Sequence, residues 1–270
     1  MRLIHNVFTL RVNFFIGKYC MFLNKNYKIL SVLVFSFLVF SCLHFSYCEN
    51  VIKDNSGIPI PFVSNSDTAI VPLSRSNEPW WINRHKEKLN VIFNQKIIFI
   101  GDSITAQWEG TEAWTVLKNK FNNRITNLGF GGDCTENVIW RLENGEFPSG
   151  INPEYVSLMI GTNNNQVPKS IAAGIGKIIQ IIHANAPSAK IILFSILPRN
   201  DWNGGMEKTR SINEIIKNYN GCLNVYYYDL GIYYLNNNGT LKEELFAEDK
   251  LHLAPQGYEV WKEKLLTIIK

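Results

Sequence analysis

Short runs of apolar residues alternate with amphipathic segments over the last two thirds of the chain. Five such runs lie at 96–100, 124–128, 155–160, 190–197 and 224–229. A short apolar run with no polar side is typical of a strand that is buried on both faces. Segments with helical spacing lie at 80–93, 111–121, 134–144, 170–185, 207–221 and 255–269. Strands that alternate with helices predict a parallel sheet covered on both faces, which is a three-layer α/β fold.

The first 48 residues have a different pattern. An uninterrupted apolar run at 29–40 follows Lys25 and Lys28, and the short stretch 46–48 precedes a polar segment. A positive stretch, an apolar stretch and smaller residues near a cleavage point are typical of a secretory signal. We therefore expect a signal peptide at 1–48 and a protein that is secreted or otherwise extracytoplasmic, for example periplasmic.

Two other interpretations of this leader stay open. The apolar residues 29–45 approach the length that spans a bilayer, so the leader could remain as a membrane anchor. The other interpretation is lipid attachment at Cys42. Residues 49–79 are rich in Asn, Ser and Pro and predict a loosely structured arm, and one domain is expected over 80–270.

The charge of the chain is unevenly distributed. The sequence has 27 basic and 23 acidic side chains, yet residues 1–48 contain five of the basic ones and no acidic one. The rest of the chain therefore carries 22 basic against 23 acidic side chains. A nearly neutral body gives no reason to expect nucleic acid as a partner. Cys134 and Cys222 lie outside the leader, and the sequence leaves open whether they form a disulfide.

Polar residues and glycines gather where the predicted strands end. Three-layer α/β folds place their active sites at the carboxyl ends of the strands. After the first strand, Asp102 or Ser103 could simply cap the next helix, or Ser103 could be a nucleophile at the corner between strand and helix. The four strand ends read Gly-Asp-Ser at 101–103, Asn-Leu-Gly-Phe-Gly-Gly-Asp at 127–133, Gly-Thr-Asn-Asn at 161–164 and Leu-Pro-Arg at 197–199.

A serine nucleophile needs a base, and three histidines lie outside the leader. His85 and His183 fall on predicted helices, where a structural role is the simpler interpretation. His252 follows Asp249 by three residues, in a loop before a helix. An acid at this spacing can hold the Nδ1–H of the imidazole and leave Nε2 free to take a proton from Ser103. The same spacing also fits a helix-capping loop with an incidental histidine.

Donors for an oxyanion are present at the same strand ends. The backbone N–H groups of Ser103 and Gly132 are candidates, since glycine lets the backbone approach a ligand closely. Asn163 adds a side-chain amide. Alone, each of these features also fits an ordinary turn. Together, at successive strand ends and with the acid–histidine pair last, they are hard to ascribe to chance.

These motifs resemble the four sequence blocks of the SGNH (GDSL) hydrolase family, in order and at suitable spacing. The blocks are Gly101–Ser103, Gly132, Gly161–Asn163 and Asp249–His252. Over about residues 80–268 the chain is similar above all to the catalytic subunits of intracellular platelet-activating-factor acetylhydrolase. It follows that subfamily nearly residue for residue at 127–146, and also at 161–164, 197–199 and 252–258.

The resemblance implies the SGNH hydrolase fold, with a flavodoxin-like five-stranded sheet in the order 2-1-3-4-5, and ester hydrolysis without a metal or cofactor. It makes Ser103 the nucleophile, His252 the base and Asp249 the acid that orients the base. The N–H groups of Ser103 and Gly132 and the side chain of Asn163 then form the oxyanion hole.

The resemblance also implies a small acyl pocket lined by Ile104, Thr162 and Leu251. The bulk of these side chains favours acetyl or another short acyl group, so the expected function is a short-chain serine esterase. The alcohol half of the substrate, an acetylated lipid or an acetylated carbohydrate, stays open. Trp108 or Trp202 could offer a surface on which a sugar stacks, although packing in the core is the simpler role.

Two other classes of function remain. One is a catalytically silent binding protein on the same fold. The presence of a suitable residue at every catalytic position argues against it. The other is a metal-dependent phosphoesterase that uses Asp102, Asp133, Asp249 and His252, although these residues do not form a recognisable ligand motif. The resembling subunits form dimers, so a homodimer is a further open expectation.

Overall fold

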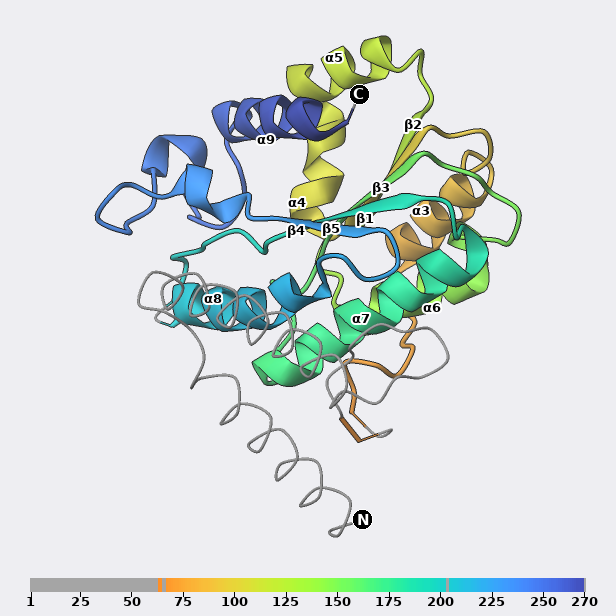
Figure 1. Cartoon of the computed structure of the whole chain (residues 1–270), viewed down its shortest axis with the longest axis horizontal. Coiled ribbons are helices and arrows are strands. Elements are labelled where there is room, and N and C mark those ends of the chain that lie inside the picture. Colours follow the sequence, from red (N-terminus) through yellow and green to blue (C-terminus); the bar gives the residue numbers. More distant parts are fainter. Residues whose placement is uncertain (1–62, 65–66, 203, 270) are drawn as a thin grey trace, which may run out of the picture. The chain divides into compact units, whose positions relative to one another are not determined.

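Five parallel strands form the middle layer of the fold (Figure 1). The computed structural model describes residues 63–64, 67–202 and 204–269. The strands lie in the order β2-β1-β3-β4-β5, which confirms the expected class and strand order. Their bounds are Ile97–Gly101 (β1), Ile125–Gly129 (β2), Tyr155–Met159 (β3), Lys190–Phe194 (β4) and Val225–Tyr228 (β5).

Helices cover both faces of this sheet (Figure 1). One face carries α4 (Ser103–Ala106), α5 (Glu112–Lys120) and α9 (Pro255–Ile268). The other face carries α6 (Thr135–Arg141), α7 (Pro168–Asn185) and α8 (Gly205–Ile216), and α3 (Pro79–Leu89) lies beside α6. Each predicted helix has a counterpart within a few residues. The structure also contains α4, a helix of a single turn that the apolar pattern did not predict.

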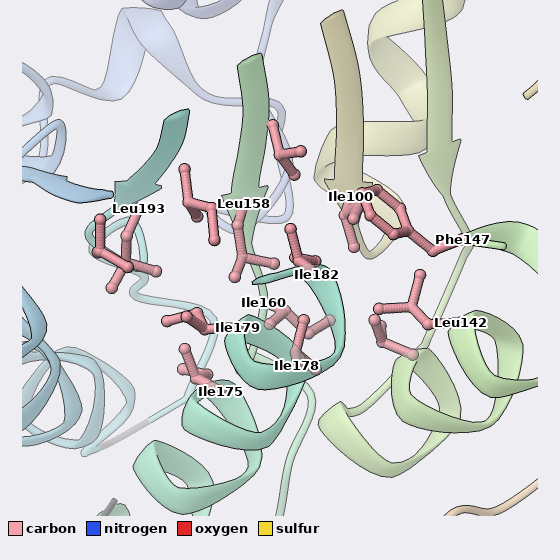
Figure 2. Close-up of a cluster of buried hydrophobic side chains, with 14 of the residues drawn as sticks. Ile100, Leu142, Phe147, Leu158, Ile160, Ile175, Ile178, Ile179, Ile182 and Leu193 are labelled. Carbon is pink, nitrogen blue, oxygen red and sulfur yellow. The ribbon is translucent and has the colours of Figure 1, made fainter. Parts of the chain in front are cut away.

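The larger apolar cluster lies between the sheet and the helices α6, α7 and α8. Figure 2 shows Ile100, Leu158 and Leu193, which come from β1, β3 and β4, beside the apolar side chains of α7. A second cluster on the opposite face joins Phe99 of β1 to Trp261 of α9. Because β1, β2 and β3 are buried on both faces, their sequences read as nearly continuous apolar runs rather than as an alternation, whereas the edge strand β5 is partly exposed.

Strand β4 is shorter than the apolar run 190–197 predicted. The chain stays buried through Leu197, but the strand ends at Phe194. Ser195 N–H still donates to the carbonyl of Tyr228 at 3.0 Å, but at the next residue a side chain takes over: Ile196 N–H donates to Oδ1 of Asn213 at 2.8 Å, and its carbonyl accepts from Nδ2 of the same residue at 2.8 Å. At Ile196 the side chain of Asn213, on α8, therefore takes the place of the hydrogen bonds to a neighbouring strand.

Trp108 is part of the core and not of a surface. Its side chain is fully buried and stacks on Trp261 with ring centroids 4.4 Å apart, and it also contacts Phe99 edge to face. The simpler interpretation of Trp108 as a core residue is therefore confirmed, and the alternative of a sugar-stacking surface at this residue is wrong. Trp202 is 45% exposed and Trp80 is 46% exposed, so aromatic surface is present at these two positions instead.

The segment 67–78, which the composition placed in a loosely structured arm, has neither helix nor strand but is held by specific hydrogen bonds. Ala69 is fully buried and its carbonyl accepts from Oγ1 of Thr135 at 2.9 Å. Leu73 donates its N–H to the carbonyl of Glu136 at 3.0 Å and accepts from Nδ2 of Asn137 at 2.9 Å. This segment is therefore anchored to the start of α6.

The predicted leader at 1–48, with its apolar run at 29–45 and Cys42, lies outside the described residues. Within the part of the chain that the structure does describe, no helix has the length and apolar character needed to cross a bilayer.

Gly101 allows α4 to pack tightly on the ends of β1 and β3. A Cβ at this position would lie 2.1 Å from Oγ1 of Thr105 and 2.5 Å from the carbonyl oxygen of Met159. We therefore expect Gly101→Ala to lower the free energy of unfolding by about 1–3 kcal/mol through overpacking. Urea denaturation measures the change. The matched control is Gly110→Ala, where no atom lies within 4 Å of the added methyl group, and equal stability of the two variants would contradict the expectation.

Candidate active site

Ser103 stands at the corner where β1 turns into α4. Asp102 caps the helix, since its Oδ1 accepts from the N–H of Ile104 at 2.9 Å, and Ser103 is the first helical residue. The Asp102 side chain is buried, and this burial raises its pKa to about 7, although the hydrogen bond from Ile104 opposes the shift. Asp102 is therefore the residue that caps α4 and orders the turn, and Ser103 is presented at the corner between strand and helix.

The loop before α9 holds an acid and a histidine together. Oδ1 of Asp249 accepts from the N–H groups of Leu251 at 3.0 Å and His252 at 2.9 Å, while its Oδ2 lies 2.5 Å from Nδ1 of His252. Partial burial would raise the pKa of Asp249, but these hydrogen bonds outweigh it and lower the pKa to about 2. An ionised Asp249 can only accept, so Nδ1 carries the proton and Nε2 is left as an acceptor.

Ser103 and His252 meet although 149 residues separate them in the sequence. Oγ of Ser103 lies 2.8 Å from Nε2 of His252. The three side chains that the motifs singled out therefore form one continuous chain of hydrogen bonds, from Asp249 through His252 to Ser103. The loop that carries this pair is braced from the side, because Asn200 donates its N–H to the carbonyl of Lys250 at 3.1 Å.

Gly132 lies in a tight turn after β2. Asp133 N–H donates to the carbonyl of Phe130 at 3.3 Å, and Gly132 has a φ of +73°, a left-handed conformation that favours glycine. The turn is tied to the end of β1 by the bond from Phe130 N–H to Gly101 O at 3.2 Å. In the described part of the structure the backbone N–H groups of Gly132 and Ser103 have no acceptor.

Asn163 joins the end of β3 to the same turn. Its Nδ2 donates to the carbonyl oxygen of Asp133 at 3.1 Å, which uses one of the two amide protons and orients the other. The structure therefore connects the third candidate donor to the turn that contains Gly132. Donors at fixed positions are what a negatively charged oxygen requires.

The carboxylate of Asp133 is the centre of a buried polar network that the sequence did not reveal. It accepts from Nε1 of Trp81 at 2.7 Å, Nε of Arg141 at 2.8 Å and Nη1 of Arg75 at 3.0 Å. Arg141 also pairs with Glu146, and Glu146 lies 2.7 Å from Nδ1 of His85. His85 therefore has the structural role that its place on a helix suggested.

Of the three residues expected to line an acyl pocket, Ile104 lies in α4 directly after Ser103, Thr162 follows β3, and Leu251 lies on the loop before α9. Ile104 and Thr162 are buried and Leu251 is half-buried. Thr162 is held by Arg199, whose Nη1 donates to the carbonyl of Thr162 at 2.6 Å and to its Oγ1 at 3.0 Å. The sequence had marked Arg199 only as part of a strand end, so this anchoring role is a finding of the structure.

The four residues of the phosphoesterase alternative are engaged with different partners. Asp102 caps α4, Asp133 binds two arginines and a tryptophan, and Asp249 binds His252. Among the described residues, no group of three or more His, Cys, Asp or Glu side chains is arranged as a metal site. Cys134, whose pKa burial raises to about 12, and Cys222 are both thiols, not a disulfide.

The sequence matches the profile of the GDSL-like lipase/acylhydrolase family over residues 99–260. It is 32% identical over 166 residues to platelet-activating factor acetylhydrolase IB subunit alpha1 of Homo sapiens, and 33% identical over 166 residues to subunit alpha2 of Rattus norvegicus. Both alignments cover 60% of this chain and 70% of the relative.

Solved structures share the fold. A GDSL-like lipase from Bacteroides thetaiotaomicron VPI-5482 matches with a TM-score of 0.58 at 18% identity, over 69% of this chain and 96% of that chain. A lipolytic protein of the G-D-S-L family from Veillonella parvula DSM 2008 matches with a TM-score of 0.54 at 22% identity, over 64% and 97%.

The buried Asp102 makes stability depend on pH. Its pKa of about 7 in the folded chain lies above the ordinary 3.8, so the folded state binds the proton more tightly than the unfolded state. The free energy of unfolding of the wild type should therefore fall, relative to Asp102→Asn, as the pH rises from about 4 to about 7. We expect the difference in free energy of unfolding between Asp102→Asn and the wild type to grow by on the order of 1–3 kcal/mol over this range, as measured by urea denaturation.

Asp102→Ala is the control for this effect. It removes the oxygen that accepts from Ile104 N–H, so relative to Asp102→Asn, which also lacks the titrating carboxyl group, it should destabilise the chain by about 1 kcal/mol at both ends of the pH range. A difference between wild type and Asp102→Asn that does not change with pH would show that the carboxyl group titrates alike in both states.

Proposed function

Because this chain belongs to the GDSL-like lipase/acylhydrolase family and is a carboxylic ester hydrolase, we propose that it hydrolyses short-chain, above all acetyl, esters through an acyl-enzyme on Ser103. The observation that carries this proposal is the hydrogen-bond chain from Asp249 through His252 to Ser103, with 2.5 Å and 2.8 Å between the bonded atoms. A nucleophile, a base and an acid in this order are the parts that acyl transfer by serine requires.

In the first step Oγ of Ser103 attacks the ester carbonyl and its proton moves to Nε2 of His252. Asp249 stays ionised and stabilises the imidazolium that forms. The carbonyl oxygen becomes an oxyanion, which the N–H groups of Ser103 and Gly132 and the amide of Asn163 bind. His252 then gives its proton to the leaving alcohol. In the second step His252 takes a proton from water as the water attacks the acyl-enzyme. The bond between the acyl carbon and Oγ of Ser103 then breaks, Oγ takes the proton back from His252, and the acid leaves.

The preference for a short acyl group is supported by the residues around Ser103. Ile104 follows the nucleophile and is buried, and Leu251 precedes His252. Thr162 is fixed by Arg199, so its side chain has little freedom to move away from a longer chain. The relatives at 32–33% identity are named acetylhydrolases, which agrees with a short acyl group.

The leaving alcohol has two candidates, an acetylated carbohydrate and an acetylated lipid. Trp202 supports the carbohydrate as the leaving group. Its side chain is exposed, and Asn200, two residues earlier on the same loop, donates its N–H to the loop that carries His252. The name of the relatives supports the lipid. Acetate release from acetylated xylan against release from a 2-acetyl phospholipid distinguishes the two.

We expect hydrolysis of p-nitrophenyl acetate to exceed that of the butyrate and octanoate esters in kcat/KM, by about 10-fold or more for each of these longer acyl groups. Ser103→Ala should lower kcat by about 10⁴-fold or more and abolish labelling by a fluorophosphonate probe. The matched control is Ser188→Ala, an exposed hydroxyl that bonds to Asn152.

The outcomes of this experiment separate the claims. Octanoate faster than acetate would refute the small acyl pocket but keep the serine esterase. No turnover and no labelling in a folded wild type would refute the mechanism and favour the silent binding protein. Turnover that persists in Ser103→Ala would assign the chemistry to another residue.

Asn163→Ala should lower kcat by about 10²–10³-fold with little change in KM, because the amide binds the oxyanion only as it forms. Its neighbour Asn165, which is exposed, provides the control Asn165→Ala. Steady-state kinetics and thermal unfolding of both variants measure the effect. A folded Asn163→Ala enzyme with wild-type turnover would remove this residue from the oxyanion hole.

A further inference from the structure

Arg75 reaches the turn after β2 from a distant part of the chain. It belongs to the irregular segment 67–78, outside the residues 99–260 that match the family profile. Its Nη1 donates to the carbonyl of Gly131 at 2.6 Å and to Oδ1 of Asp133 at 3.0 Å. The guanidinium thus bonds to the residues on both sides of Gly132.

The guanidinium also lies against Gly132 itself. A Cβ on Gly132 would be 3.3 Å from Nη1 and 3.4 Å from Nη2 of Arg75. Arg75 therefore contacts three successive residues of the turn, and the middle one carries the N–H group assigned to the oxyanion. A planar group with several donors can fix both the position and the tilt of such a turn.

Arg75 is itself held in place by its neighbours. Nε and Nη2 donate to the two carboxylate oxygens of Glu78, each at 2.8 Å, and the guanidinium lies 5.2 Å from the ring centre of Trp80. The two carboxylates of Glu78 and Asp133 already balance its charge. These contacts suit a structural brace better than a binding site for an anionic group of the substrate.

Movement of this turn would disturb two oxyanion donors at once. Gly132 lies within it, and the carbonyl of Asp133 accepts from Nδ2 of Asn163. Stabilisation of an oxyanion needs donors 2.7–3.1 Å from the charged oxygen, and a displacement of about 1 Å can cost about 10²-fold in rate.

We propose that Arg75 is a positioning residue, which holds the turn Gly131–Asp133 so that the oxyanion hole is formed before the substrate binds. The inference rests on the proposed function, since it takes Gly132 and Asn163 as the donors. It extends the machinery of the reaction to a segment of the chain that the family profile does not include.

The test compares Arg75→Ala, Arg75→Lys and the control Arg210→Ala, whose side chain is exposed and pairs with Glu207. We expect Arg75→Ala to lower kcat for p-nitrophenyl acetate by about 10–10²-fold with KM within about 3-fold of wild type. Arg75→Lys keeps a positive charge and one donor group, so its kcat should lie between those of the wild type and Arg75→Ala. Guanidinium at a millimolar, non-denaturing concentration should restore part of kcat in Arg75→Ala alone.

A second measurement does not depend on turnover. Amide hydrogen exchange, followed by mass spectrometry on peptides that cover 130–137, should be faster in Arg75→Ala than in the wild type and unchanged in Arg210→Ala. Peptides from α7 should exchange alike in all three proteins, which shows that the change is local.

Three results would overturn the inference: wild-type kcat in Arg75→Ala, a rise in KM alone, or unchanged exchange at 130–137. If Arg75→Ala does not fold, Arg75→Lys decides by the same kinetics and exchange. If the wild type itself turns over no ester, the proposed function fails, while the exchange comparison still decides whether Arg75 holds the turn.

Discussion

The carboxylate of Asp133 has no access to solvent, and this constraint shapes the whole region after β2. Burial raises the pKa of this carboxyl group, and Arg141, Trp81 and Arg75 act against the shift by supplying charge and hydrogen bonds. These three donors come from α6, α3 and the segment before α3. A buried charge that lost any of them would be costly, so three separate parts of the chain must converge on one turn. The position of Gly132 follows from that convergence.

The histidine side of the site is fixed by different means. Asp249 uses one carboxylate oxygen for the backbone of its own loop and the other for His252, so the acid shapes the loop and orients the base with one side chain. Ser103 is fixed independently, through the cap that Asp102 provides for α4. Ser103 and His252, the two side chains that exchange a proton in the proposed mechanism, are therefore each held by an acid close to them in the sequence. The two side chains contact each other directly. Little rearrangement is needed before the first step.

The parts of this structure that the sequence predicted are those with a local or periodic signal. The central strands β1 and β3 are buried on both faces, so their apolar runs are nearly continuous, and Asp249 precedes His252 on one short loop. Trp108 has no such signal, because it lies in the short 3-10 turn Gln107–Gly110 after α4, and a segment of this length has no periodicity that shows whether a side chain faces the core. The partners of Arg75 in the turn after β2 lie 56 and 58 residues away, and the segment around Arg75 has no periodicity. Contacts of this kind depend on how distant loops meet, which local pattern does not encode.

Thr162 and Asn163 are adjacent in the chain but are anchored in opposite directions. Arg199, on the loop after β4, holds Thr162, while the turn after β2 holds Asn163 through the carbonyl of Asp133. In the proposed mechanism the first residue limits the acyl group and the second binds the oxyanion. The loop after β3 is thus held at two points by different parts of the fold, and in the proposed mechanism a longer acyl chain that displaces Thr162 also shifts the donor beside it. Acyl selection and transition-state stabilisation are then coupled through one peptide bond, so a poorly fitting acyl group loses kcat as well as affinity.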